Sequence, residues 1–265
     1  APSPPHAPGA ADTDRPHSRG PGPQTLTTDP ALADQGWISP DGKSRAFVAS
    51  RNGQADIWIM DLASKAVRNI TNNPAGDFRP SWSPDGKWIA FSSDRESTKP
   101  RFGFTVLHSA EIYLIHPDGT GIRRVTHHNA FVGSPSWSAD GKRLLFYTAT
   151  MDEVNKIKSP QRLRATTQIA ELDLATNVER ELTSGAGEKW SPHLLADGRV
   201  AYVSGGPEGG IEFVSGPRGM GGETRSPSWA ADGKHMVFHA GAGIGGPTMR
   251  QGSTRSTTRS TQPPV

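Results

Sequence analysis

The chain has 265 residues, a net charge of +3, 33% hydrophobic residues, 30 glycines and 23 prolines. This much Gly and Pro disfavours a helical protein, while the apolar content is sufficient for one large all-β domain. The absence of cysteine excludes disulfides, thiolate metal sites and cysteine nucleophiles. The sequence contains no run of 18 apolar residues that could span a membrane. The net positive charge is small and spread along the chain, which disfavours nucleic-acid binding.

Both ends of the chain are predicted to be disordered. Residues 1–24 form a Pro-, Ala- and Gly-rich leader without apolar periodicity, and residues 241–265 are rich in Gly, Ser, Thr and Arg. Neither segment has enough apolar surface to offset the entropy lost on ordering. Because the first residue is Ala1 rather than Met, we expect either an exported protein whose signal peptide has been removed or a fragment.

An internal repeat occupies residues 25–240. An Asp-Gly pair recurs at successive spacings of 44, 55, 57 and 35 residues, mostly within Ser-Pro-Asp-Gly-Lys or a close variant. The aspartates of these pairs are Asp41, Asp85, Asp140, Asp197 and Asp232. In the first four copies a threonine lies 14 residues before the aspartate, at Thr27, Thr71, Thr126 and Thr183. Such a period indicates a repeat architecture.

Each repeat predicts four short antiparallel strands. In Ser-Pro-Asp-Gly, Pro at the second position and Gly at the fourth favour a type I turn between the first two strands. In the second repeat, Trp82 ends the strand before the turn and residues 88–91 form the strand after it. Residues 111–115 form the third strand, and the fourth ends at Thr126. Four short strands in about 44 residues predict a β-propeller blade.

Two stretches carry a family resemblance. RPSWSPDGKWIAFSSDR (residues 79–95) and AEIYLIHPDGTGIRRVT (residues 110–126) closely resemble the repeat of TolB-type periplasmic propellers. The same repeat occurs in propellers attached to prolyl oligopeptidase-like peptidases and to some amidohydrolases. The resemblance covers about residues 25–240 and implies an all-β ring of six blades. Asp94 in the first stretch is expected to accept backbone N–H groups.

About four and a half blades are expected, as in a propeller truncated from six. Leu26-Thr27 is interpreted as the last strand of a missing or split blade; three full units follow, then an irregular fourth and the first two strands of a fifth. In the fourth unit Leu194 replaces the tryptophan, and the Gly-rich stretch 205–210 replaces a clean third strand. The composition changes abruptly at Gly241. A premature end, a misread frame or a gene fragment would each explain this change, and the sequence does not choose among them. An unpaired strand edge would favour self-association.

Insertions in two repeats are candidate binding loops. The second and third repeats are longer than the first, and the extra residues, 96–109 and 151–165, fall between the second and third strands. Both loops open on the face where the first strand begins, opposite the Asp-Gly turns, and insertions on one face often form a binding surface. The candidates are Arg101, Phe102 and Phe104 in one loop and Arg162 and Arg164 in the other. The alternative is a pair of solvated surface loops.

The residues that enter the first strands form a second candidate group on the same face. Aromatic and charged side chains in mixture suit a peptide end or a polar ligand. This group contains Asp77, Phe78, Arg79, Glu188, Lys189, Trp190 and Arg225. The alternative is that Asp77 and Arg79 simply pair with neighbouring blades.

Catalytic and metal-binding patterns are weak. There is no Gly-x-Ser-x-Gly elbow, and 205–210 lacks the lysine and the strand–helix context of a phosphate loop. His127-His128 has no third ligand at a convincing spacing, so we interpret it as a polar loop between blades. Asp152-Glu153 is interpreted as part of a solvated loop. We therefore expect neither catalysis, metal nor cofactor.

Two functions follow. The first is a non-catalytic binding module, periplasmic or secreted as the resemblance implies, that engages a protein or peptide partner through loops on one face. The alternative is the accessory propeller of a hydrolase whose catalytic domain lies outside this chain.

Overall fold

The computed structural model describes residues 33–51, 54–97, 109–128, 130–155, 165–206, 209–217, 219, 221, 224–229 and 236–240. The predicted ends, 1–24 and 241–265, and the pair Leu26-Thr27 lie outside these residues. Within them, no helix is long and apolar enough to cross a membrane.

The described residues form five antiparallel sheets, one for each Asp-Gly repeat. Blade one contains β1 (Ala33–Ile38), β2 (Ser44–Arg51), β3 (Gln54–Asp61) and β4 (Val67–Asn69). Blade two contains β5 (Asp77–Trp82), β6 (Ile89–Ser93), β7 (Glu111–Ile115) and β8 (Arg123–Arg124). Blade three contains β9 (Phe131–Trp137), β10 (Arg143–Ala149), β11 (Gln168–Asp173) and β12 (Glu179–Glu181). Blade four contains β13 (Lys189–Leu194), β14 (Val200–Ser204) and β15 (Gly210–Phe213), and blade five β16 (Thr224–Trp229) and β17 (Met236–Ala240).

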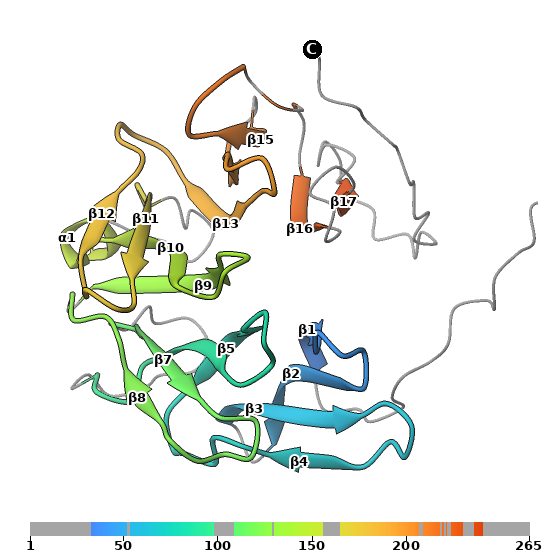
Figure 1. The fold of residues 1–265 in the computed structure, drawn as a ribbon. Helices are drawn as coiled ribbons and strands as arrows, with labels where there is room; N and C mark the ends of the chain where they lie inside the picture. Colours follow the sequence, from blue (N-terminus) through green and yellow to red (C-terminus); the bar gives the residue numbers. More distant parts are fainter. Residues whose placement is uncertain are drawn as a thin grey trace, which may run out of the picture.

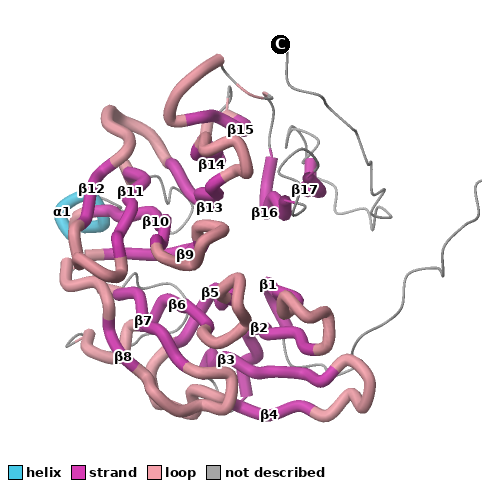
Figure 2. Tube along the Cα trace, in the orientation of Figure 1, coloured by secondary structure: helices cyan, strands magenta, loops and turns pink. Residues whose placement is uncertain are grey.

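The sheets follow one another around a common centre, with the first strand of each blade innermost (Figure 1). Strands within each sheet pair in chain order, and the inner strands of consecutive blades pack against one another. The tube in Figure 2 shows strands joined by loops, and the short helix α1 (Met151–Asn155) is the one helix of the described residues. The all-β propeller architecture is thus confirmed for the described residues.

The Asp-Gly turns have the predicted hydrogen bond between first and fourth residues. Gly42 N–H donates to the Ser39 carbonyl at 2.9 Å, and the same bond joins Gly86 to Ser83, Gly141 to Ser138 and Gly198 to Leu195. Gly42 has φ of +72°, a conformation that other residues adopt only with strain. The aspartate accepts the N–H two residues later, as Asp41 does from Lys43 at 3.0 Å.

The repeated threonine closes the outer strand onto the third strand. The backbone N–H of Ile57 donates to Thr71 Oγ1 at 3.0 Å, that of Ile112 to Thr126 at 2.8 Å, and that of Ile169 to Thr183 at 2.9 Å. A polar residue at the start of the third strand accepts each threonine hydroxyl; these residues are Asp56, Glu111 and Gln168. The repeated threonine therefore marks a hydrogen bond that recurs in each of the three four-stranded blades.

Apolar side chains fill the space between blades. Phe91 of blade two packs toward blade one, and Phe146 of blade three packs toward blade two; both are fully buried. Tyr202 of blade four packs toward blade three in the same way. Each blade thus hides one sheet face against the next.

Two local expectations about blades three and four were wrong. The stretch 205–210 does not replace the third strand: β15 pairs with β14 from Ala201–Phe213 to Ser204–Gly210, because Gly206 turns the chain tightly. The start of the insertion 151–165 is helical, with Thr150 Oγ1 accepting the Glu153 N–H at the beginning of α1.

Candidate functional site

One side of the blades, here called the insertion face, collects the candidate residues. On this side the first strand begins, the second ends and the third begins, as the pairs Asp77–Ser93 and Ser93–Glu111 demonstrate. Residues Arg101, Phe102, Phe104, Arg162 and Arg164 lie outside the described residues. Arg225 lies in β16, where only its backbone is described. The remaining candidates are at the starts of β5 and β13.

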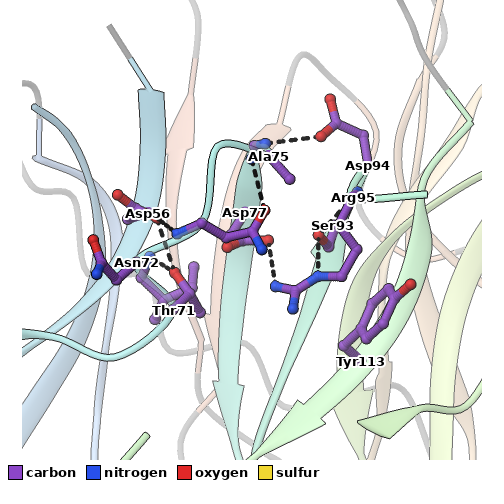
Figure 3. A network of polar contacts seen from close by, with 12 residues as sticks. Asp56, Thr71, Asn72, Ala75, Asp77, Ser93, Asp94, Arg95 and Tyr113 are labelled. Carbon is purple, nitrogen blue, oxygen red and sulfur yellow. Dashed lines mark hydrogen bonds and ion pairs between the residues drawn. The ribbon is translucent and has the colours of Figure 1, made fainter. Parts of the chain in front are cut away.

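Asp77 is part of the wall of blade two. Its side chain is buried, and Oδ1 accepts a hydrogen bond from Arg95 Nη2 at 3.0 Å (Figure 3). Burial raises the pKa of the Asp77 carboxyl, while the Arg95 guanidinium opposes this shift. The carboxylate anchors Arg95 and offers no exposed surface to a partner.

The guanidinium of Arg95 lies in a pocket of polar and aromatic side chains at the end of β6. Its Nε donates to Ser93 Oγ at 2.9 Å, and its guanidinium lies 5.4 Å from the centroid of the Phe91 ring and 4.7 Å from that of Tyr113. Figure 3 shows Arg95 between Asp77 and the Tyr113 ring. A carboxylate, a hydroxyl and two aromatic rings thus hold one planar cation.

Asp94 has the role expected from the sequence. Its Oδ1 accepts the backbone N–H of Gly76 at 2.8 Å, which ties the end of β6 to the loop entering β5. On the other side of that loop, Asp56 accepts hydrogen bonds from Thr71 at 3.2 Å and from Asn69 at 3.0 Å. Figure 3 shows these carboxylates around the same loop. The network fixes the junction between blades one and two.

Arg79 contacts the neighbouring blade. Its Nη1 donates to Ser134 Oγ at 2.9 Å and to Tyr147 Oη at 2.6 Å. Arg79 has φ of +55°, and the equivalent residues Ser134 and Ser191 have +50° and +49°. Each precedes a proline at a shift in strand register, so a β-bulge recurs at the same place in each inner strand. The repeated X-Pro dipeptide was its sequence signal, which pattern reasoning missed.

Glu188 and Lys189 line a cavity of about 800 Å³ on the insertion face of blade four. This blade-four cavity is formed by the loop entering β13, the hairpin between β14 and β15, and the outer part of β15. Its principal lining residues are Glu188, Lys189, Ser204, Gly206, Glu212 and Phe213. Trp190, the adjacent candidate, is half-buried against the apolar residues of β14 and β15 instead.

The charges of the cavity are unequally accessible. Lys189 is 7% exposed, and its Nζ donates to the carbonyls of Thr167 at 3.2 Å and Gly185 at 3.1 Å. Burial lowers the pKa of the Lys189 ammonium, while Glu212 opposes the shift. Glu188 and Glu212 are half-buried. Glu212 accepts hydrogen bonds from Ser204 at 2.8 Å and Tyr202 at 2.9 Å. Sequence reasoning missed Glu212 because only the pairing of β14 with β15 places it here.

The histidine and acidic pairs have structural contacts. His128 Nε2 lies 2.8 Å from Glu179 Oε2 in blade three, which agrees with a polar contact between blades. Asp152 is exposed on α1, and Glu153 Oε2 accepts the Thr166 N–H at 3.4 Å. Across the described part of the chain, no three His, Asp or Glu side chains are grouped to hold a metal ion.

Comparison with protein families gives one match over most of the chain. The model of the TolB beta propeller domain matches residues 30–204. An uncharacterized protein of Agrobacterium fabrum is 30% identical over 189 residues, covering 70% of this chain and 59% of that protein. An uncharacterized peptidase of Bacillus subtilis is 30% identical over 48% of this chain and 23% of the peptidase. A Tol-Pal system protein TolB of Francisella tularensis is 31% identical over 63% of this chain and 34% of its own length.

Solved structures agree on the fold. A putative TolB from Agrobacterium tumefaciens superposes with a TM-score of 0.63 at 22% identity, covering 81% of this chain and 72% of that one. The chain spans less than two thirds of the length of the three curated relatives described above.

Proposed function

The chain belongs to the TolB β-propeller family, and we propose that it is a non-catalytic, exported binding module that holds a protein or peptide partner on its insertion face. The blade-four cavity chiefly supports this proposal, because two residues selected from the sequence, Glu188 and Lys189, line it. A large concave site with a few convergent polar groups is the usual form of a binding site. The Francisella relative is named as a Tol-Pal system protein, which supports a place in the periplasm.

Site-specific photo-cross-linking tests which face binds. Ser184, exposed on the loop before β13, and Ala196, exposed in the Asp-Gly turn of blade four, are each replaced by p-benzoylphenylalanine. With extracts of the cell envelope, adducts are expected from position 184 and not from position 196. Adducts from position 196 alone would contradict the proposal. Purified chain should also fail to hydrolyse model peptides and esters.

The second candidate is an accessory propeller of a hydrolase, favoured by the similarity to the Bacillus subtilis peptidase. In that case the partner is a catalytic domain of the same polypeptide. Sequencing the gene on both sides of these 265 codons tests it: a peptidase or amidohydrolase domain in the same reading frame would favour this alternative.

A further inference from the structure

Arg79 lies at the β-bulge of β5, the inner strand of blade two (Figure 1). Its φ of +55° is a left-handed conformation that is strained for a residue with a side chain. The equivalent positions of blades three and four hold Ser134 and Ser191, whose φ values are +50° and +49°. Because serine meets the requirement of the backbone at this bulge, the reason for an arginine in blade two lies in its guanidinium.

Two hydroxyl groups and an aromatic ring hold that guanidinium along one edge. Nη1 of Arg79 donates to Ser134 Oγ at 2.9 Å and to Tyr147 Oη at 2.6 Å, and the guanidinium carbon lies 5.4 Å from the centroid of the Tyr147 ring. Both hydrogen bonds therefore use the same nitrogen. The N–H groups of Nε and Nη2 point the same way from the other edge and form a fork, which has no acceptor within the described part of the chain.

The positive charge of Arg79 has no carboxylate beside it among the described residues. Several half-buried arginines of the same blades lie within 3.0 Å of a carboxylate oxygen; these are Arg95, Arg124, Arg143 and Arg199. Burial raises the pKa of the Tyr147 hydroxyl, while Arg79 opposes the shift, so this hydroxyl is neutral near pH 7. The groups that hold Arg79 thus supply oxygens but no negative charge.

We propose that Arg79 binds a carboxylate of the partner through its Nε and Nη2 edge. The inference rests on the proposed function and specifies one chemical group that the insertion face recognises. Arg79 is half-buried and lies two residues after Asp77, with which β5 begins on this face. The two oxygens of a planar carboxylate match the two parallel N–H donors of the fork, and such charge-assisted, bidentate hydrogen bonds are stronger than neutral ones.

The contacts with Ser134 and Tyr147 favour this role because they fix the guanidinium before a ligand arrives. A side chain that is already ordered loses less conformational entropy on binding. The carboxylate can belong to an Asp or Glu side chain of the partner or to the C-terminus of a peptide, since both present the same two oxygens.

Short peptides test the inference on the full 265-residue chain. Acetyl-Gly-Glu-Gly-amide and its glutamine counterpart are titrated at constant ionic strength while the Nε–H signal of Arg79 is followed by NMR. Acetyl-Gly-Gly-Gly with a free C-terminus and with an amidated one forms the second pair. At least one carboxylate peptide should shift the signal saturably, and its uncharged counterpart should bind at least about tenfold more weakly. The pair that responds identifies the source of the carboxylate.

Substitutions at Arg79 locate the contact. Arg79→Ser introduces the residue that the equivalent bulges carry, and Arg79→Lys keeps the charge without the fork. Each should weaken binding of the carboxylate peptide at least about tenfold, measured through the backbone amide signal of Ser134. Arg123→Gln is the control and should leave binding unchanged, because Arg123 is exposed on the outer strand β8 and lies 5.2 Å from the centroid of the Trp88 ring.

Equal binding of the charged and uncharged peptides would overturn the inference, and so would either Arg79 variant that binds as tightly as wild type. If both variants misfold, the wild-type titrations alone decide, because they observe the Arg79 side chain directly. If these titrations fail while partner adducts still form at position 184, only this inference fails; adducts at position 196 alone would reject the proposed function itself.

Discussion

The indole Nε1 of Trp137 donates a hydrogen bond to the backbone carbonyl of Ser81, 3.0 Å away on the inner strand of the preceding blade. The same contact joins Trp82 to the carbonyl of Trp37 at 3.1 Å. The tryptophan before the Asp-Gly turn therefore links blade two to blade one and blade three to blade two. Leu194 cannot make this bond in blade four, where His193 Nδ1 lies 3.3 Å from Ser136 Oγ and its ring stacks on Trp229.

Trp137→Phe should lower the free energy of unfolding by about 1–3 kcal/mol, because it removes a buried hydrogen bond between two blades. Trp82→Phe should cost less than about 1 kcal/mol from the lost bond, since water can reach the exposed Trp37 carbonyl. Urea unfolding with an unchanged m-value measures both. Equal losses would show that burial does not distinguish the two links.

Thr126→Val should also destabilise the chain, by about 1–3 kcal/mol, although valine has nearly the same shape. The substitution leaves the Ile112 N–H and the Glu111 carboxylate without the hydroxyl that joins them at 2.8 and 2.6 Å. Thr126→Ser keeps the hydroxyl and is the matched control. Thermal unfolding of both variants measures the difference, and a serine variant as unstable as the valine variant would rule out the hydrogen bond as the cause.

Features of this fold that depend on residues close together in the sequence could be predicted, and features that depend on pairing between strands could not. Turns such as Ser39–Gly42 and the spacing of Thr126 depend on nearby residues, so the repeat predicted the blades, and Asp94 was assigned its role correctly. The bulge at Arg79 was not foreseen, because a positive φ before proline is unusual and is maintained by pairing across strands. The blade-four cavity was not foreseen in full, because only the pairing of β14 with β15 places Glu212 beside Ser204.

The contact between His128 and Glu179 should make stability depend on pH. The hydrogen bond that His128 donates to the Glu179 carboxylate raises the pKa of His128 above its ordinary value of 6.5, with burial opposing the shift. A raised pKa in the folded state means that the added stability is complete below pH 6.5 and is lost as the pH rises through the folded-state value. We expect at most about 1 kcal/mol for this partly exposed pair.

Unfolding of wild type and Glu179→Gln between pH 5 and 9 measures this effect. The two proteins should differ most near the acidic end and converge at the alkaline end. Glu181→Gln, on the same strand and outside this hydrogen bond, is the control. A difference that stays constant across the range would mean that titration of His128 is not involved.

Arg95→Ala should destabilise the chain by about 3–5 kcal/mol, because it leaves the carboxylate of Asp77 buried without its counter-ion. The variant also removes the guanidinium that lies between Asp77 and the Tyr113 ring and leaves its site empty. Methylguanidinium should bind there and restore stability, by about 1.4 kcal/mol at ten times its Kd. Such rescue would establish that this blade geometry holds a guanidinium that is not attached to the chain.

The controls separate rescue from a general effect of the salt. Methylammonium carries the same charge without the planar fork, so it should rescue Arg95→Ala poorly. Wild-type protein should gain nothing from methylguanidinium at the low concentrations used, because its Arg95 side chain already fills the site. If methylguanidinium leaves Arg95→Ala as unstable as methylammonium does, then the contacts around Arg95 hold its guanidinium only because the side chain is covalently attached at the end of β6.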